Sequence, residues 1–208
     1  MTTITVSRQM GSYGYEASQR AADILGYRLV YRELINIAAR RAGAPEMALA
    51  AIDELGLLNL CPDPAVCQAY RDAVHQVMHE IAGFGNAIII GRSGQVILKD
   101  TPGVIHVRII APFQVRADRI ASRHQISVEC ARSRIEASDH YRQRYLQRFY
   151  QVRCNDPELY DLTINTARIS PAETAALLVN CVREHQLETI HSHADNRENL
   201  PTHHLSAA

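Results

Sequence analysis

The chain has 208 residues, of which 47% are hydrophobic and 21% are charged, and its formal net charge at pH 7 is zero. This length suits one domain that buries about 70% of the surface of its unfolded chain. A neutral chain is not a polyanion binder as a whole. No apolar run approaches the roughly 20 residues of a membrane span, so we expect no membrane partner.

The cysteines indicate the redox compartment. They are odd in number and scattered, with no Cys-x-x-Cys pair, at positions 61, 67, 130, 154 and 181. This usage predicts reduced thiols, and the sequence runs into its first strand with no signal-peptide pattern before it. We therefore expect a cytoplasmic protein. The basic residues are almost all arginine, since Lys99 is the only lysine.

The first half of the chain alternates short apolar strands with amphipathic helices. We predict strands at residues 4–6, 27–30 and 87–90. We predict helices at residues 17–25, 32–42, 45–55 and 66–81. Gly26 stands where a left-handed residue commonly ends a helix. Gly83 and Gly85 end the long helix before the third strand.

The second half continues the alternation and adds a long, arginine-rich helix. We predict strands at residues 104–110 and 160–165. We predict helices at residues 113–121, 127–150 and 171–182. Ser170 and Glu173 form a capping box, with Pro171 at the first helical position. From about Thr189 the chain is polar and aperiodic, which predicts a disordered tail over 189–208.

Strands that alternate with helices predict right-handed βαβ units and a parallel sheet covered on both faces. We expect an α/β fold in which a five-stranded parallel sheet forms the middle of three layers. One domain spans residues 1–188, and its arginine-dense segment at roughly 125–155 forms a helical lid.

The first candidate site is the turn between the first strand and the first helix, Ser7–Glu16. Gly11 and Gly14 let backbone N–H groups turn toward an anion, and the helix presents its positive end. Ligands of such sheets bind at the carboxyl ends of the strands. The turn lacks the Lys and the hydroxyl of G-x-x-x-x-G-K-[S/T], so a tight turn without a ligand is the alternative.

Two further arginine-bearing stretches are candidates. Arg92 follows the third strand between glycines and can bind two phosphate oxygens at once; the alternative is an exposed loop arginine. Residues 108–153 hold ten arginines and four acidic residues. They form either a flap that closes over polyphosphate or a solvated helix face paired with carboxylates. His75 and His79 do not form H-E-x-x-H, so we expect no protein-held metal.

Taken together, these residues resemble the cytidylate kinase-like family of P-loop nucleotide kinases over roughly residues 3–183. The resemblance depends on the order and spacing of six segments, at residues 4–12, 32–35, 91–98, 111–120, 139–145 and 160–166. The last of them, Tyr-Asp-Leu-Thr-Ile-Asn-Thr, is the most specific.

The resemblance implies a nucleoside-monophosphate-kinase fold and a phosphotransferase that moves the γ-phosphoryl group of ATP to a nucleoside monophosphate such as CMP. ATP and Mg²⁺ are the implied cofactors, with Mg²⁺ bridging the donor phosphates. Arg92 would hold the acceptor phosphate and Arg142 would reach in from the lid, which makes these two the candidate catalytic residues. The candidate cofactor-binding residues are Arg8, Gly11, Ser12, Tyr13, Gly14 and Tyr15.

Three residues depart from the family pattern. Tyr13 stands where Gly is usual, Tyr31 where an Asp commonly precedes Arg-Glu, and Ser93 where true cytidylate kinases have an Asp that contacts the base. A catalytically weak nucleotide-binding or regulatory relative is therefore the alternative to a kinase. A nucleic-acid or polyphosphate binder is a third hypothesis, against which the lack of an aromatic platform for stacking bases argues. Base preference and oligomeric state stay open.

Overall fold

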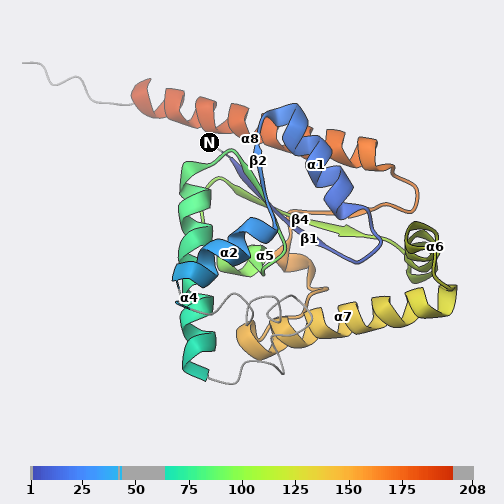
Figure 1. Ribbon diagram of the computed structural model, residues 1–208. Helices are drawn as coiled ribbons and strands as arrows, with labels where there is room; N and C mark the ends of the chain where they lie inside the picture. Colours follow the sequence, from blue (N-terminus) through green and yellow to red (C-terminus); the bar gives the residue numbers. More distant parts are fainter. Residues whose placement is uncertain (1, 42, 44–63, 199–208) are drawn as a thin grey trace, which may run out of the picture.

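The computed structural model describes residues 2–41, 43 and 64–198 (Figure 1). Five parallel strands form one sheet in the order β2-β3-β1-β4-β5. They are β1 (Thr3–Arg8), β2 (Arg28–Val30), β3 (Ala87–Ile90), β4 (Val104–Ile110) and β5 (Leu162–Asn165). In the centre, Val6 pairs with Ile90 on one side and with Val107 on the other. The predicted five-stranded parallel sheet is confirmed.

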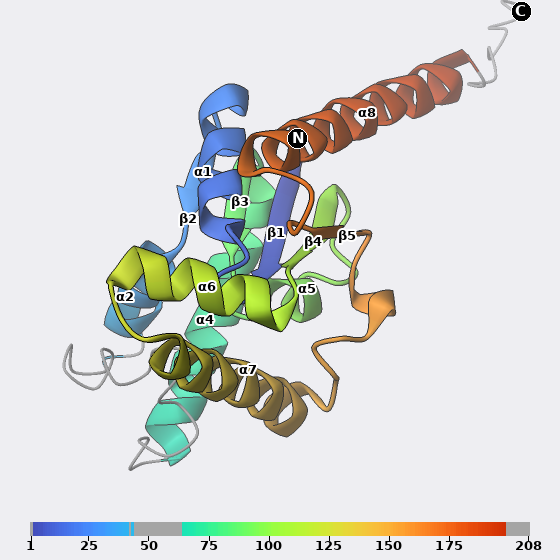
Figure 2. The same cartoon turned by 90° about the vertical axis from the view of Figure 1, so that its right-hand side faces the viewer.

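Helices cover both faces of this sheet and its carboxyl edge (Figures 1 and 2). They are α1 (Gly14–Leu25), α2 (Arg32–Arg41), α4 (Pro64–Phe84), α5 (Gly94–Ile97), α6 (Phe113–His124), α7 (Val128–Tyr150), the 3₁₀ turn η1 (Pro157–Leu159) and α8 (Pro171–Glu198). Helices α1 and α8 pack on one face, and α2 and α4 pack on the other. Helices α6 and α7 pack together beside the carboxyl ends of the strands, where the lid was expected.

The three-layer arrangement follows from strands that are apolar on both faces. Along β3, Ile88 and Ile90 face α1 and α8, whereas Ala87 and Ile89 face α4. All four residues are buried. A continuous apolar run is therefore the expected pattern for a central parallel strand with helices on both sides.

The predicted helix signals have the expected geometry. Gly26 ends α1 with a left-handed φ of 66°. The capping box is formed: the Ser170 backbone N–H donates to the Glu173 carboxylate (2.8 Å), and the Glu173 N–H donates to the Ser170 hydroxyl (3.2 Å). The hydrogen bond from the Ser170 backbone N–H lowers the pKa of the Glu173 carboxyl group. No helix in the described ranges is both long and apolar enough to cross a membrane.

The structure also differs from the sequence expectations. Helix α8 continues to Glu198, whereas the disordered tail was expected from residue 189. Residues 183–198 contain no Gly or Pro. A segment without an apolar period lacks a face that packs on the sheet, but its residues keep their intrinsic helix propensity. The remainder of that tail, and the helix expected at 45–55, lie outside the described residues. The short helix α5 was not predicted, because its single turn carries no periodic signal.

Candidate functional site

The loop between β1 and α1 lies at the carboxyl edge of the sheet and contains two left-handed residues. Gly11 has φ +79°, and Tyr13 is left-handed at φ 59°, directly before the first residue of α1. The buried Ser12 hydroxyl donates to the Gln9 carbonyl (2.8 Å). A left-handed tyrosine is strained by about 1–3 kcal/mol, so surrounding contacts must stabilise this loop.

Arg119 of α6 supplies much of that support. Its guanidinium donates to the carbonyl of Gly11 (3.3 Å) and to both the hydroxyl and the carbonyl of Thr166 (3.0 and 2.6 Å). The Thr166 hydroxyl in turn donates to the Ser12 carbonyl (2.9 Å). The Arg119 guanidinium also lies 4.2 Å from the centroid of the Tyr13 ring. Tyr13 is thus packed under an arginine rather than standing free in the loop.

Arg116, one turn earlier on α6, joins the loop to the lid. It is only 4% exposed, and it donates to the carbonyls of Ala111 (3.1 Å) and Met10 (3.4 Å) and to the Asp139 carboxylate on α7 (2.8 Å). The other Asp139 oxygen lies 3.6 Å from the Arg142 guanidinium. Asp139 therefore connects the buried arginine with an arginine that faces the pocket.

The far end of the lid helix α7 is anchored to α4. The Tyr150 hydroxyl and the His75 Nε2 are 3.0 Å apart, and their rings stack at a centroid distance of 5.9 Å. Burial raises the pKa of Tyr150 and lowers the pKa of His75. Burial therefore favours the neutral form of both side chains, and their contact joins the end of α7 to α4.

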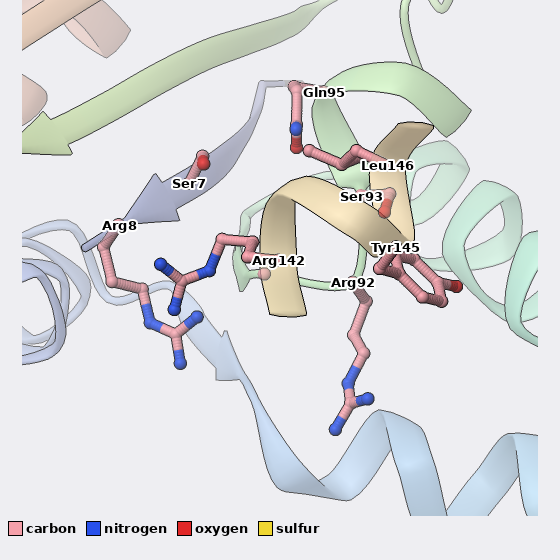
Figure 3. A pocket seen from close by; sticks show the side chains of 9 residues that line it. Ser7, Arg8, Arg92, Ser93, Gln95, Arg142, Tyr145 and Leu146 are labelled. Atoms are coloured by element: carbon pink, nitrogen blue, oxygen red, sulfur yellow. The ribbon is translucent and has the colours of Figure 1, made fainter. Parts of the chain in front are cut away.

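Two adjoining cavities open at this edge of the sheet. The loop cavity lies along the β1–α1 turn, and its lining includes Arg8, Gly11, Tyr13, Gly14, Tyr15, Tyr31, Arg119 and Arg142. The lid cavity lies under α7 and is lined by Ser7, Arg8, Gly91, Arg92, Ser93, Gln95, Arg142, Tyr145 and Leu146 (Figure 3). Arg8 and Arg142 line both cavities, and they stand where the cavities meet.

The candidate residues are thus largely brought together, with one distinction. Arg8 and Arg142 line both cavities, whereas Arg92 lines only the lid cavity of the two, and its side chain extends in a different direction in Figure 3. Arg92 belongs to a run of three left-handed residues, Gly91, Arg92 and Ser93, with φ 76°, 56° and 60°. Two strained non-glycine residues in succession are more common at functional sites than elsewhere.

Sequence reasoning did not single out several lining residues. Ser7, at the end of β1, lies 3.4 Å from the Tyr160 hydroxyl, which donates to the Cys154 carbonyl (2.9 Å). Burial raises the pKa of the Tyr160 phenol. Tyr145 and Leu146 cover the lid cavity from α7. The position of Ser7 next to the end of β1 was an available signal. Tyr145 lies in the 139–145 segment that carries the resemblance, but no role in the site was predicted for it.

The sheet order, the glycine-bearing loop between β1 and α1 and the arginine-rich helix α7 are those of a P-loop kinase fold. Solved structures agree. A protein from Eubacterium ventriosum matches 88% of this chain and 99% of its own, with a TM-score of 0.68 and 17% identity. Shikimate kinase from Acinetobacter baumannii matches 90% of this chain and 96% of its own, with a TM-score of 0.52 and 15% identity.

Sequence comparison identifies the family. The model of the cytidylate kinase-like family matches residues 3–168. A cytidylate kinase of Pyrococcus horikoshii is 33% identical over 84% of this chain and 85% of its own length. A cytidylate kinase of Pyrococcus abyssi is 31% identical over 90% of this chain and 96% of its own. The chain belongs to the cytidylate kinase-like family, which confirms the resemblance found in the sequence.

Proposed function

We propose that this protein is a cytoplasmic nucleoside monophosphate kinase that transfers the γ-phosphoryl group of ATP to a nucleoside monophosphate such as CMP. The observation that carries the proposal is the charge of the lid cavity. Among its described lining residues are three arginines, Arg8, Arg92 and Arg142, and no carboxylate. Such a lining suits an acceptor that is itself an anion, because each guanidinium can bind two phosphate oxygens.

The absence of a carboxylate among these lining residues favours an acceptor that carries a phosphate group over an acceptor that reacts through a hydroxyl group, such as a sugar. A hydroxyl acceptor has a proton to lose, and kinases that use one place an aspartate beside it. A phosphate monoester is already ionised and needs only positioning and charge neutralisation. Asp139, which lines an adjoining pocket with Arg8 and Arg142, is engaged by Arg116 and Arg142. The lid cavity therefore favours a nucleotide phosphate over a hydroxyl.

In this proposal the donor lies along the loop cavity and the acceptor lies in the lid cavity. The Ser12 N–H donates to the Gln9 carbonyl, so the N–H groups of Tyr13 and Gly14, at the positive end of α1, bind the donor phosphates. Arg92 holds the acceptor phosphate, and Gln95 and Tyr145 lie where they can contact its base. Arg142 lies at the junction of the cavities, where charge develops during transfer.

A magnesium ion would be carried by the nucleotide rather than by the loop. In this loop the Ser12 hydroxyl donates to Gln9, and the Glu16 carboxylate pairs with Arg123. No cluster of three or more His, Cys, Asp or Glu side chains suited to a metal occurs in the described part of the chain. The loop residues therefore do not fit a protein-held ion, and no step is assigned to one.

The arginine-dense segment does not support a nucleic-acid binder. Several of its arginines contact the protein itself: Arg116 pairs with Asp139, Arg119 with Thr166, and Arg123 with Glu16. These contacts hold part of the charge of the segment at the loop and at α7, whereas Arg134 and Arg144 are exposed. Small nucleotides are the proposed ligands.

We expect a non-hydrolysable ATP analogue with Mg²⁺ to raise the melting temperature. At 100 times its Kd a ligand stabilises a protein by about 2.7 kcal/mol, which corresponds to roughly 5–11 °C for a domain of this size. Coupled ADP release over a panel of nucleoside monophosphates then measures turnover. No thermal shift at millimolar ligand would contradict a nucleotide site, and a shift without turnover would favour the regulatory relative.

We expect Arg92→Lys to weaken binding of the acceptor. A lysine keeps the charge but loses the two-pronged contact with phosphate, so the Kd for CMP should rise roughly tenfold to a hundredfold, as for loss of a hydrogen bond to a charged group. The ATP analogue should bind as before, because Arg92 does not line the loop cavity. Calorimetry with each ligand measures both values, and Arg134→Lys on the exposed side of α7 is the control. Equal weakening for both ligands would make Arg92 structural.

A further inference from the structure

The P-loop pattern places a lysine directly after its second glycine, at the start of the helix, where it reaches the β- and γ-phosphates. In this chain Gly14 is the first residue of α1, and Tyr13 has the left-handed conformation that suits a glycine. The only lysine, Lys99, follows α5 and lines neither the loop cavity nor the lid cavity. The positive charge at this point of the loop must therefore come from another residue.

The space beside Gly14 is occupied by the side chain of Arg8. A Cβ atom added to Gly14 would lie 2.5 Å from the Arg8 Cβ and 3.0 Å from its Cγ. Any side chain that left α1 at this position would collide with the aliphatic stem of Arg8. Arg8 is the last residue of β1, so its stem passes from the sheet edge through the place where a helix-borne lysine would begin.

The head group of Arg8 is held at the junction of the two cavities. Its Nη2 donates to the Tyr31 hydroxyl (3.0 Å), and its guanidinium carbon lies 5.0 Å from the centroid of the Tyr31 ring. The Tyr31 ring in turn contacts the ring of Tyr15 on α1, with centroids 5.8 Å apart. Tyr31, which departs from the family pattern, thus has a defined contact: it orients Arg8 toward both cavities.

We propose that Arg8 supplies, from the end of β1, the positive charge that P-loop kinases supply with a lysine from the start of the helix, and that it binds the terminal phosphates of the donor. The proposal depends on the proposed function. It explains two features together: Gly14 has no side chain because Arg8 occupies that space, and the loop needs no lysine because the guanidinium is already there. A planar guanidinium also binds two oxygens where an ammonium group binds as a point charge.

The experiment relocates the charge. Arg8→Gln removes it and keeps part of the stem, Arg8→Gly removes both, and the double variant Arg8→Gly/Gly14→Lys restores a cation at the helix position. The Kd for a non-hydrolysable ATP analogue with Mg²⁺ and the Kd for CMP are measured by calorimetry, together with the melting temperature. We expect Arg8→Gln to weaken the ATP analogue roughly tenfold to a hundredfold and the double variant to bind it better than Arg8→Gly.

Arg8→Lys separates a charge role from a structural one. It keeps both stem and charge, so it should bind the ATP analogue better than Arg8→Gln at a similar melting temperature. If wild type binds the analogue and Arg8→Gln binds it equally well, the role of Arg8 is refuted while the nucleotide site stands. If Arg8→Lys and Arg8→Gln lose binding and melting temperature equally, Arg8 is a structural support. If wild type binds no nucleotide, both proposals fail.

Discussion

Replacing Arg142 with Ala is expected to lower kcat for CMP phosphorylation by about a thousandfold. Arg142 lies on the lid helix and lines both cavities, so its guanidinium can contact the phosphoryl group while that group moves between donor and acceptor. An arginine that stabilises the transition state in this way contributes about 10³ or more to kcat. Coupled ADP release at saturating ATP and CMP measures the loss.

The control for this variant is Arg144→Ala, because Arg144 is exposed on the same helix. It should leave kcat within a factor of about two, as expected for a surface arginine. The distinguishing feature is the balance between kcat and KM. A higher KM with unchanged kcat would mean that Arg142 binds ground states only, and the assignment to phosphoryl transfer would then be withdrawn.

The sequence predicted the fold because short apolar runs alternate with amphipathic helices, and such runs are typical of strands in the centre of a parallel sheet. It also located the anion-type loop, since Gly11 and Gly14 interrupt the change from strand to helix. The need for these glycines depends on distant residues. A Cβ on Gly11 would lie 2.9 Å from the Arg116 carbonyl oxygen, and one on Gly14 would meet Arg8. Close contacts between a glycine and a residue far away in the chain leave no periodic pattern in the sequence.

The arginines of α6 show most clearly where sequence reasoning ends. Arg116, Arg119 and Arg123 are similar in the sequence, yet Arg116 is 4% exposed while the Arg123 side chain is 60% exposed. The difference comes from what lies opposite each residue. Arg116 meets Met10, which is 106 residues away in the chain, and Arg119 meets Thr166. Helical spacing predicts on which face of a helix a residue lies, but it does not predict which residue of another element packs against it.

Replacing Asp139 with Ala is expected to cause a large loss of stability. The variant leaves the buried Arg116 guanidinium without the carboxylate that pairs with it at 2.8 Å. Removing one member of a buried ion pair costs about 3–5 kcal/mol. Because the Asp139 side chain is 34% exposed, we expect about 3 kcal/mol, at the lower end of that range. Thermal unfolding should show a drop of roughly 6–12 °C.

A double-mutant cycle tests whether this loss comes from the stranded charge. In Arg116→Met/Asp139→Leu both charges are replaced by apolar side chains, so the penalty for an unpaired buried guanidinium disappears. The carbonyls of Ala111 and Met10 lose a donor, which costs about 0.5–1.5 kcal/mol each. Measured against the single variants Arg116→Met and Asp139→Leu, the double variant should show a coupling of more than about 1 kcal/mol. If the two single changes add without coupling, Arg116 is stabilised by its backbone contacts alone, and Asp139 instead acts mainly through Arg142.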